Sequence, residues 1–193
     1  MPLKVIPGLR VLVVVAVAAL GAAMTGCGGD GDGGEDALAL GETAVVEYTQ
    51  VTDSGEPAGA TTLAVTVTDV RQGTQEELAD GGFEIDSQDQ GATPHYIDVR
   101  FENQGEAPVE RNIDVSLEGP GGETLPRTVL FDSGGKPFET CRNVTEGMLA
   151  PGDAYEACTL VLVPEGSDVE TVLFVSQKAN GEIVFSRWDA SGS

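Results

Sequence analysis

Basic, aromatic and histidine residues are scarce in this 193-residue chain. It contains 10 Lys and Arg against 32 Asp and Glu, which gives a formal net charge of -22. Nucleic-acid binding relies on clustered Lys and Arg at the phosphates, so this balance argues against a nucleic-acid partner. It also argues against electrostatic adhesion to an anionic lipid surface. One histidine, three cysteines and 5% aromatic residues leave little material for a transition-metal centre.

The N-terminal segment carries a targeting pattern. Lys4 and Arg10 precede an apolar run that extends from Val11 to Met24. A basic start followed by about a dozen apolar residues is typical of a secretory signal, whereas a membrane-spanning helix needs about 20 such residues. We therefore interpret residues 1–26 as a signal peptide that is removed on export.

The sequence Met24-Thr-Gly-Cys27 at the end of this segment resembles the lipobox of bacterial lipoproteins. That resemblance implies cleavage after Gly26 and a diacylglyceryl group on the Cys27 sulfur. Each buried methylene contributes about 0.8 kcal/mol, so two or more acyl chains anchor a protein stably. We expect the mature protein to stay attached to the outer face of the cell membrane. The alternative is an ordinary secretory signal in which Cys27 is incidental.

The cysteine count fits a lipid on Cys27. Three cysteines in an exported protein leave one without a disulfide partner. If Cys27 carries lipid, Cys141 and Cys158 remain as a pair, and their disulfide would close a loop of about 17 residues worth on the order of 3 kcal/mol. The alternatives are a metal pair or a redox pair. The spacing of Cys141 and Cys158 is not C-x-x-C, however, and no histidine lies near either cysteine in the sequence.

Residues 27–43 are expected to form a flexible tether. The stretch from Gly28 to Asp36 contains only Gly, Asp and Glu, so it has no apolar residue and no periodicity. We place the globular domain at residues 44–190. The sequence therefore predicts a single domain connected to the membrane by an acidic linker.

Beyond the tether, apolar and polar residues alternate as in half-buried β-strands. The pattern predicts strands at residues 44–51, 61–70, 96–102, 113–118, 127–131, 154–163, 171–176 and 183–188. Glu76–Ala79 is expected to form at most one helical turn. Asn180-Gly181 predicts a hairpin in which both residues take positive φ. Seven or eight short antiparallel strands predict an all-β sandwich, with a closed barrel as the alternative.

Three segments suggest a family. They are a strand that ends at Asn103 and continues through a turn to Pro108, the turn Leu149-Ala-Pro-Gly152, and the strand Cys158–Pro164. Together they resemble an immunoglobulin-like domain family that is common in secreted Gram-positive lipoproteins and related to a secreted immunogenic mycobacterial protein. The resemblance covers roughly residues 60–188. It implies an immunoglobulin-like β-sandwich without an assigned activity.

No catalytic constellation is evident in the sequence. A Ser–His–Asp or Cys–His site needs a histidine base, and His95, at the start of an expected strand, is interpreted as a partly exposed edge residue. Ser54, Ser133 and Ser167 lie beside Gly or Asp in expected turns and not in a G-x-S-x-G motif. With 32 acidic residues, close carboxylate pairs arise by chance and do not indicate a glycosidase. We predict a protein that is not an enzyme and has no cofactor.

Residues 75–94 form a long segment with little strand pattern, six acidic residues and no basic residue. Loops of this length inside a domain are usually functional or disordered. Carboxylates beside glycines are suitable calcium ligands, with Glu84, Asp86 and Asp89 as the candidates. A solvated acidic loop is the simpler interpretation. Trp188 is expected to fill one end of the sandwich, with stacking on a ligand as the alternative.

These observations predict a lipid-anchored, extracytoplasmic binding or interaction module whose loops face a protein or a cell-envelope partner. The first alternative is a calcium- or small-ligand-binding lipoprotein that uses residues 75–94. The second is an enzyme that uses carboxylates alone.

Overall fold

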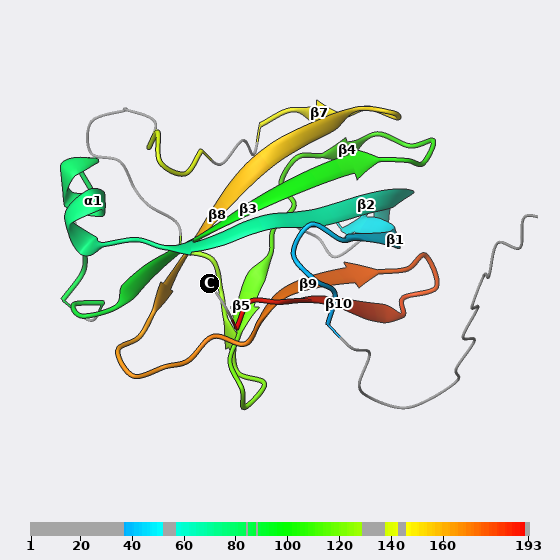
Figure 1. Cartoon of the computed structure of the whole chain (residues 1–193). Coiled ribbons are helices and arrows are strands. Elements are labelled where there is room, and N and C mark those ends of the chain that lie inside the picture. Colours follow the sequence, from blue (N-terminus) through cyan, green and yellow to red (C-terminus); the bar gives the residue numbers. More distant parts are fainter. Residues whose placement is uncertain are drawn as a thin grey trace, which may run out of the picture. The chain divides into compact units, whose positions relative to one another are not determined.

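Two antiparallel sheets face each other in the structure. The computed structural model describes residues 37–51, 57–83, 85–87, 89–128, 138–142 and 146–191. The first sheet has the order β1 (Thr43–Val51), β2 (Pro57–Gln72), β3 (Thr93–Asn103) and β8 (Ala154–Val163). The second has the order β10 (Ile183–Asp189), β9 (Thr171–Gln177), β5 (Ser116–Glu118) and β6 (Thr124–Leu125). Strands β4 (Val109–Glu110) and β7 (Met148–Leu149) form a separate pair (Figure 1).

The predicted all-β sandwich is confirmed. Within the described ranges, seven strands have three or more residues, and one cluster of buried side chains from both sheets forms the core between them. The two-residue strands β4, β6 and β7 were not predicted because two residues show no alternation. The prediction of a strand at residues 127–131 was wrong for the described part of that segment, since Arg127 and Thr128 are not in a strand. There the hydroxyl of Thr128, and not a backbone carbonyl, accepts the hydrogen bond from the Leu162 N–H.

The inner face of the first sheet follows the alternation in the sequence. Leu63, Val65 and Val67 of β2 are completely buried. An irregularity in the register between Val67 and Asp69 shifts the pairing with β3 by one residue. Because of this bulge, Val70, three residues after Val67, also packs in the core.

The outer face of the same sheet is covered at β3 and β8. Helix α1 (Gln75–Asp80) begins at a capping box in which Thr74 and Glu77 exchange side-chain to backbone hydrogen bonds. It contributes Leu78 to a second cluster of buried residues, whose other members are Phe83, Tyr96, Cys141, Cys158 and Leu160. Helix formation at residues 76–79 is therefore confirmed, but the helix has six residues and is longer than the single turn predicted. Part of the acidic segment thus covers the sheet.

The residues that precede β1 belong to the sandwich. The Leu38 N–H donates to the Arg187 carbonyl and the Leu38 carbonyl accepts from the Asp189 N–H, both at 2.8 Å, so Leu38 pairs in parallel with β10. Trp188 is completely buried, and its indole N–H donates to the Glu42 carbonyl at 2.9 Å. The structure thus corrects the tether assignment for residues 37–43 and confirms a core role for Trp188. The rest of the tether and the signal peptide lie outside the described residues.

The predicted hairpin joins β9 to β10, but its backbone differs from the expectation. The Gly181 N–H donates to the Lys178 carbonyl and the Lys178 N–H donates to the Glu182 carbonyl. Gly181 has a φ of 87°, whereas Asn180 is not among the positive-φ residues. Only the glycine takes the left-handed conformation, because the longer loop needs one such residue where a two-residue hairpin needs two.

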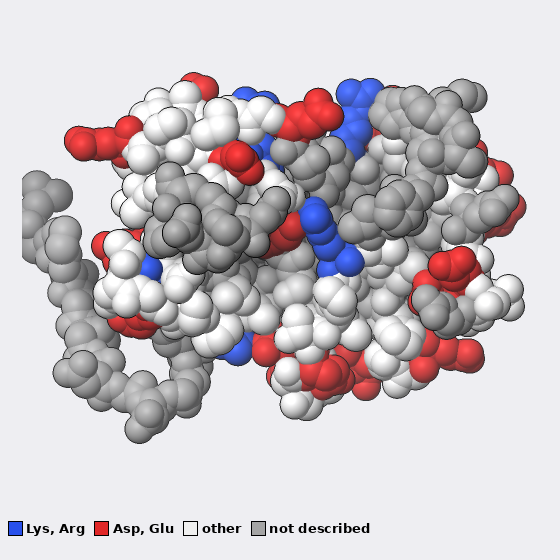
Figure 2. Space-filling model, turned by 180° about the vertical axis from the view of Figure 1, so that it is seen from behind, with Lys and Arg blue, Asp and Glu red and all other residues white. Residues whose placement is uncertain are grey.

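Acidic side chains outnumber basic ones on the face of the protein seen in Figure 2. They are spread over that face, with the basic side chains among them. Among the described residues, no helix is long and apolar enough to cross a membrane.

Candidate functional site

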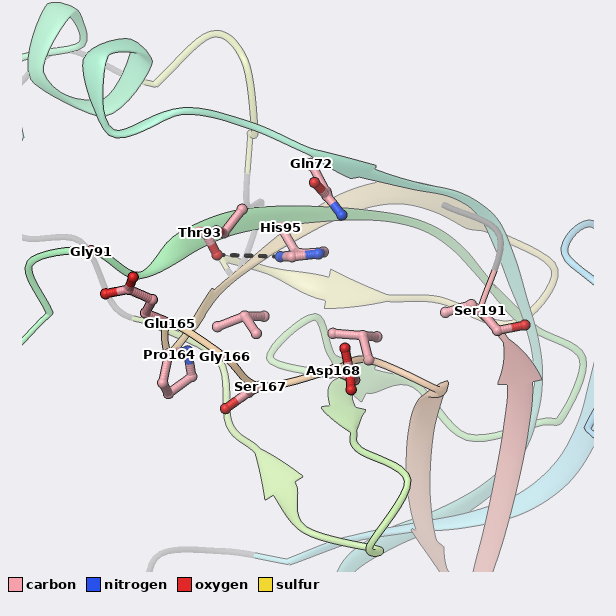
Figure 3. A pocket seen from close by; sticks show the side chains of 13 residues that line it. Gln72, Gly91, Thr93, His95, Pro164, Glu165, Gly166, Ser167, Asp168 and Ser191 are labelled. Atoms are coloured by element: carbon pink, nitrogen blue, oxygen red, sulfur yellow. Dashed lines mark hydrogen bonds between the residues drawn. The ribbon is translucent and has the colours of Figure 1, made fainter.

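A polar pocket of about 300 Å³ lies where β2 and β8 end and β3 begins. Its walls also include the loop between β8 and β9 and the residues that follow β10 (Figure 3). The side chains discussed below are Gln72, His95, Glu165, Ser167, Asp168 and Ser191. Elements that are far apart in the sequence therefore meet at one end of the sandwich.

His95 lies at the inner side of this pocket. It shares the inward face of β3 with Ile97 and pairs across the sheet with Gln72 of β2 and Val161 of β8. Its exposed fraction is 4%. The expectation of a partly exposed edge histidine was wrong, because β3 has a neighbouring strand on both sides.

The hydrogen bonding of His95 determines which of its ring nitrogens faces the pocket. Nδ1 lies 3.2 Å from the carbonyl oxygen of Thr93. A carbonyl only accepts, so Nδ1 carries the proton and Nε2 of the neutral ring is an acceptor. Burial lowers the pKa of His95, while the hydrogen bond to Thr93 acts in the opposite direction. The neutral ring is thus the favoured form at pH 7.

Nε2 of His95 has no hydrogen-bond partner among the described residues. In Figure 3 this nitrogen faces away from Thr93, toward the space between Gln72, Asp168 and Ser191. Nε2 is not among the fully buried side-chain atoms that lack a partner in the described residues, so this acceptor is accessible from the pocket. It is therefore the kind of group that a ligand or water in the pocket would satisfy.

A tight turn places the acidic side chains of the pocket. The Ser167 N–H donates to the Pro164 carbonyl at 3.1 Å, and Gly166 has a φ of 81°. Glycine at this position of a turn is required by the positive φ. The loop ends at Glu170, whose N–H donates to the Glu118 carbonyl. Backbone hydrogen bonds at both ends therefore hold Glu165 and Asp168 beside the pocket.

Ser191 and Gly91 complete two other walls. Both the backbone N–H and the hydroxyl of Ser191 donate to the Asp189 carboxylate, at 2.9 and 2.6 Å. These hydrogen bonds lower the pKa of Asp189. Because its proton is used, the Ser191 hydroxyl presents only acceptor capacity. Gly91 has a φ of 90°, and a Cβ there would lie 3.2 Å from a Glu165 carboxylate oxygen.

The pocket is consequently rich in acceptors and negative in charge. Glu165 and Asp168 are its acidic residues, and no Lys or Arg is among the lining residues that the structure describes. His95, Ser167 and Asp168 all border it, but in the described part of the chain no hydrogen bond links His95 to either of the other two. A nucleophile activated by a base needs that hydrogen bond. The arrangement suits binding of a hydrogen-bond donor better than attack by Ser167.

The other end of β3 has a buried polar side chain of a different kind. Asn103 is completely buried. Its Oδ1 accepts from the Thr61 hydroxyl at 2.6 Å and the Gly105 N–H at 3.1 Å. Its Nδ2 donates to the carbonyls of Ala107 at 2.8 Å and Leu149 at 3.0 Å. All four hydrogen-bonding positions of the amide are used, so Asn103 has a structural role.

The structure confirms the predicted cysteine pair. Four other residues considered in the sequence analysis are not described. Cys141 and Cys158 form a disulfide with a Cα–Cα distance of 5.0 Å. Cys27, Ser54, Ser133 and Glu84 lie outside the described residues.

The calcium candidates gain no support from the described side chains. The Asp89 N–H donates to the Asp86 carbonyl at 2.9 Å, which is a backbone turn. No group of three or more His, Cys, Asp or Glu residues that could hold a metal occurs in the described ranges. A calcium site at Glu84, Asp86 and Asp89 stays a prediction.

No protein-family model and no curated protein matches the chain. Solved structures do. The secreted protein MPT63 of Mycobacterium tuberculosis has a TM-score of 0.48 and 11% identity, over 82% of this chain and 99% of MPT63. The yjhA protein of Bacillus subtilis has a TM-score of 0.44 and 15% identity, over 79% and 99% of the respective chains.

A candidate lipoprotein of B. subtilis, ycdA, has a TM-score of 0.44 and 13% identity, over 66% of this chain and 36% of ycdA. Likenesses at these scores and identities do not indicate a shared activity. Membership of the immunoglobulin-like lipoprotein family stays a prediction.

Sequence patterns did not single out the pocket. The turn Pro164–Ser167 was recognisable as a turn, but nothing in the sequence placed it next to His95 or Ser191. The one usable signal was a histidine two residues before the inward-facing Ile97, since that spacing puts both on the same face of a strand.

Proposed function

We propose that the protein is a lipid-anchored, extracytoplasmic binding protein that is not an enzyme. The observation that carries the proposal is the sequence Met24-Thr-Gly-Cys27 directly after a basic and apolar N-terminal segment. The disulfide between Cys141 and Cys158 supports export, because disulfides persist in oxidising compartments.

The binding role is supported by the pocket at the start of β3. Pockets of about 300 Å³ and larger hold small ligands, and this one combines an accessible acceptor on the largely buried His95 ring with the side chains of Glu165 and Asp168. We propose that the protein or cell-envelope partner expected from the sequence meets the domain at this end, or that a small ligand binds in the pocket. The pocket favours this ligand site over the acidic segment 75–94.

Partitioning of the full-length protein between detergent and aqueous phases tests the anchor. The native protein, expressed in a bacterium that processes lipoproteins, should enter the detergent phase, and Cys27→Ala should remain in the aqueous phase. A matched control, Cys141→Ser with Cys158→Ser, removes the other two cysteines and should partition like the native protein. Equal partitioning of the native protein and Cys27→Ala into water contradicts the anchor.

A further inference from the structure

We infer that the pocket at the start of β3 binds a small organic cation that carries primary ammonium groups, with His95 Nε2 and the Asp168 and Glu165 carboxylates as its acceptors. This inference rests on the proposed binding role and specifies the ligand. Nothing in it depends on the lipid anchor.

The first step is the hydrogen-bonding character of the walls. The only ring proton of neutral His95 is donated to the Thr93 carbonyl, and the hydroxyl proton of Ser191 is donated to Asp189. Both groups therefore offer only lone pairs to the pocket. Gln72, Thr93 and Ser167 are the side chains with a proton still to donate. A matching ligand must supply several donors.

The second step is charge. Glu165 and Asp168 give the pocket two carboxylates, and no basic residue is among its described lining. An anion or a neutral acceptor would meet like charge and lone pairs on these walls. An ammonium group supplies a positive charge and three N–H donors, which complements both features.

The third step is the buried histidine, which distinguishes this pocket from an acidic patch. His95 is 4% exposed, lies among Ile97, Val161 and other inward-facing residues, and still has a ring nitrogen without a partner. The surrounding strands fix its ring, so the acceptor is preorganised for a ligand at little entropic cost.

Calorimetric titration of the full-length protein in neutral detergent, at 150 mM salt to screen surface charge, tests this inference. The probe is 1,4-diaminobutane. The comparison probe is its hexamethylated derivative, which keeps both charges and has no N–H donor. We expect the diamine to bind and the hexamethylated compound to bind at least about tenfold more weakly, the fold-change of a lost hydrogen bond to a charged group.

Variants locate the binding. Asp168→Asn should weaken diamine binding about tenfold or more. The matched control Glu106→Gln changes an exposed acidic residue in the loop that follows the opposite end of β3 and should bind like the native protein. Asp168 is exposed, so its substitution leaves the core intact, which circular dichroism verifies.

The single histidine gives an independent readout. The chain has one histidine, so its imidazole Cε1–H resonance needs no assignment. That resonance should shift as the diamine is added and should need about tenfold more diamine in Asp168→Asn. An unshifted resonance, equal binding of the hexamethylated compound, or equal weakening by Glu106→Gln would overturn the inference in favour of general attraction to acidic surface. Absence of any diamine binding overturns it as well, and the partitioning result for Cys27→Ala is unaffected in either case.

Discussion

Strand β3 carries a buried polar side chain at each end of its inward face, and the two differ in how their hydrogen bonds are used. Asn103 makes four side-chain hydrogen bonds and is completely buried. His95 is almost as buried, yet only Nδ1 has a partner among the described residues. A satisfied buried amide stabilises one fold, whereas a ring nitrogen that opens onto a pocket is available to a ligand.

The segments around the two ends of β3 differ in the same way, because those around Asn103 hydrogen-bond to its side chain and those around His95 leave Nε2 without a partner in the described part of the chain. At Asn103, the loop after β3 and strand β7 converge on the amide, as shown by the hydrogen bonds from Gly105 and to Leu149. At His95, the neighbouring loop brings the Glu165 and Asp168 carboxylates, which add negative charge without bonding the ring. We infer that one end is closed for stability and the other is left open for binding.

The largest expected effect is at the closed end. Asn103→Ala leaves the buried Leu149 carbonyl and Thr61 hydroxyl, and the half-buried Ala107 carbonyl and Gly105 N–H, without their partner. Each unsatisfied group costs about 1–3 kcal/mol, so the free energy of unfolding should fall by at least about 3 kcal/mol. Chemical denaturation measures it. A loss below about 1 kcal/mol would mean that water replaces the amide and that the two ends are less different than the contacts indicate.

A loss of stability of similar size is expected when the disulfide on the outer face of the sheet is removed. Cys141→Ser with Cys158→Ser should lower the free energy of unfolding by about 3 kcal/mol, because the crosslink restricts the unfolded chain. The cluster on the outer face would then be held by packing of Leu78, Phe83, Tyr96 and Leu160 without the crosslink. Denaturant titration with and without reductant provides the measurement, and the serine variant should show no further response to reductant.

A smaller effect, dependent on pH, is expected at His95. Its pKa is lowered in the folded protein from the ordinary value of 6.5, so below about pH 6.5 the unfolded chain binds a proton that the folded protein does not. The free energy of unfolding should therefore fall as the pH drops from 7 through the folded-state pKa. His95→Gln removes this dependence in that window. If the free energy of unfolding depended on pH identically in the native protein and in His95→Gln, burial of the ring would not lower the pKa of His95.

The smallest effect is expected at the pocket rim. Asp168→Asn changes an exposed side chain and should alter the free energy of unfolding by no more than about 0.5 kcal/mol. Together with the loss of diamine binding, this separates function from stability. A destabilisation of about 2 kcal/mol would instead assign Asp168 a structural role like that of Asn103.

Much of the fold was predictable from alternation alone. The strands at residues 61–70, 96–102 and 154–163 lie within β2, β3 and β8 because their β-branched and aromatic residues repeat every second position. The bulge after Val67 and the two-residue strands were not predictable, because each depends on what the partner strand offers. The strand prediction for the described part of residues 127–131 was wrong for the same reason.

The candidate site was predictable only in fragments. His95 and Ser167 were noticed and assigned to an edge and a turn, while Asp168, Glu165 and Ser191 carried no pattern of their own. Burial of His95 follows from β3 lying between β2 and β8. Strand order is a property of long-range pairing, and short-range periodicity does not encode it.

The sequence by itself determined the export pattern, the acidic character, the strand segments and the two cysteines available for a disulfide, since each depends on composition or local spacing. The tertiary structure alone decided that β3 is interior, that its two ends differ, and that carboxylates from the β8–β9 loop gather around an unpartnered imidazole nitrogen. Residues separated by about seventy positions meet there because sheet pairing and loop closure, which no local pattern records, bring them together.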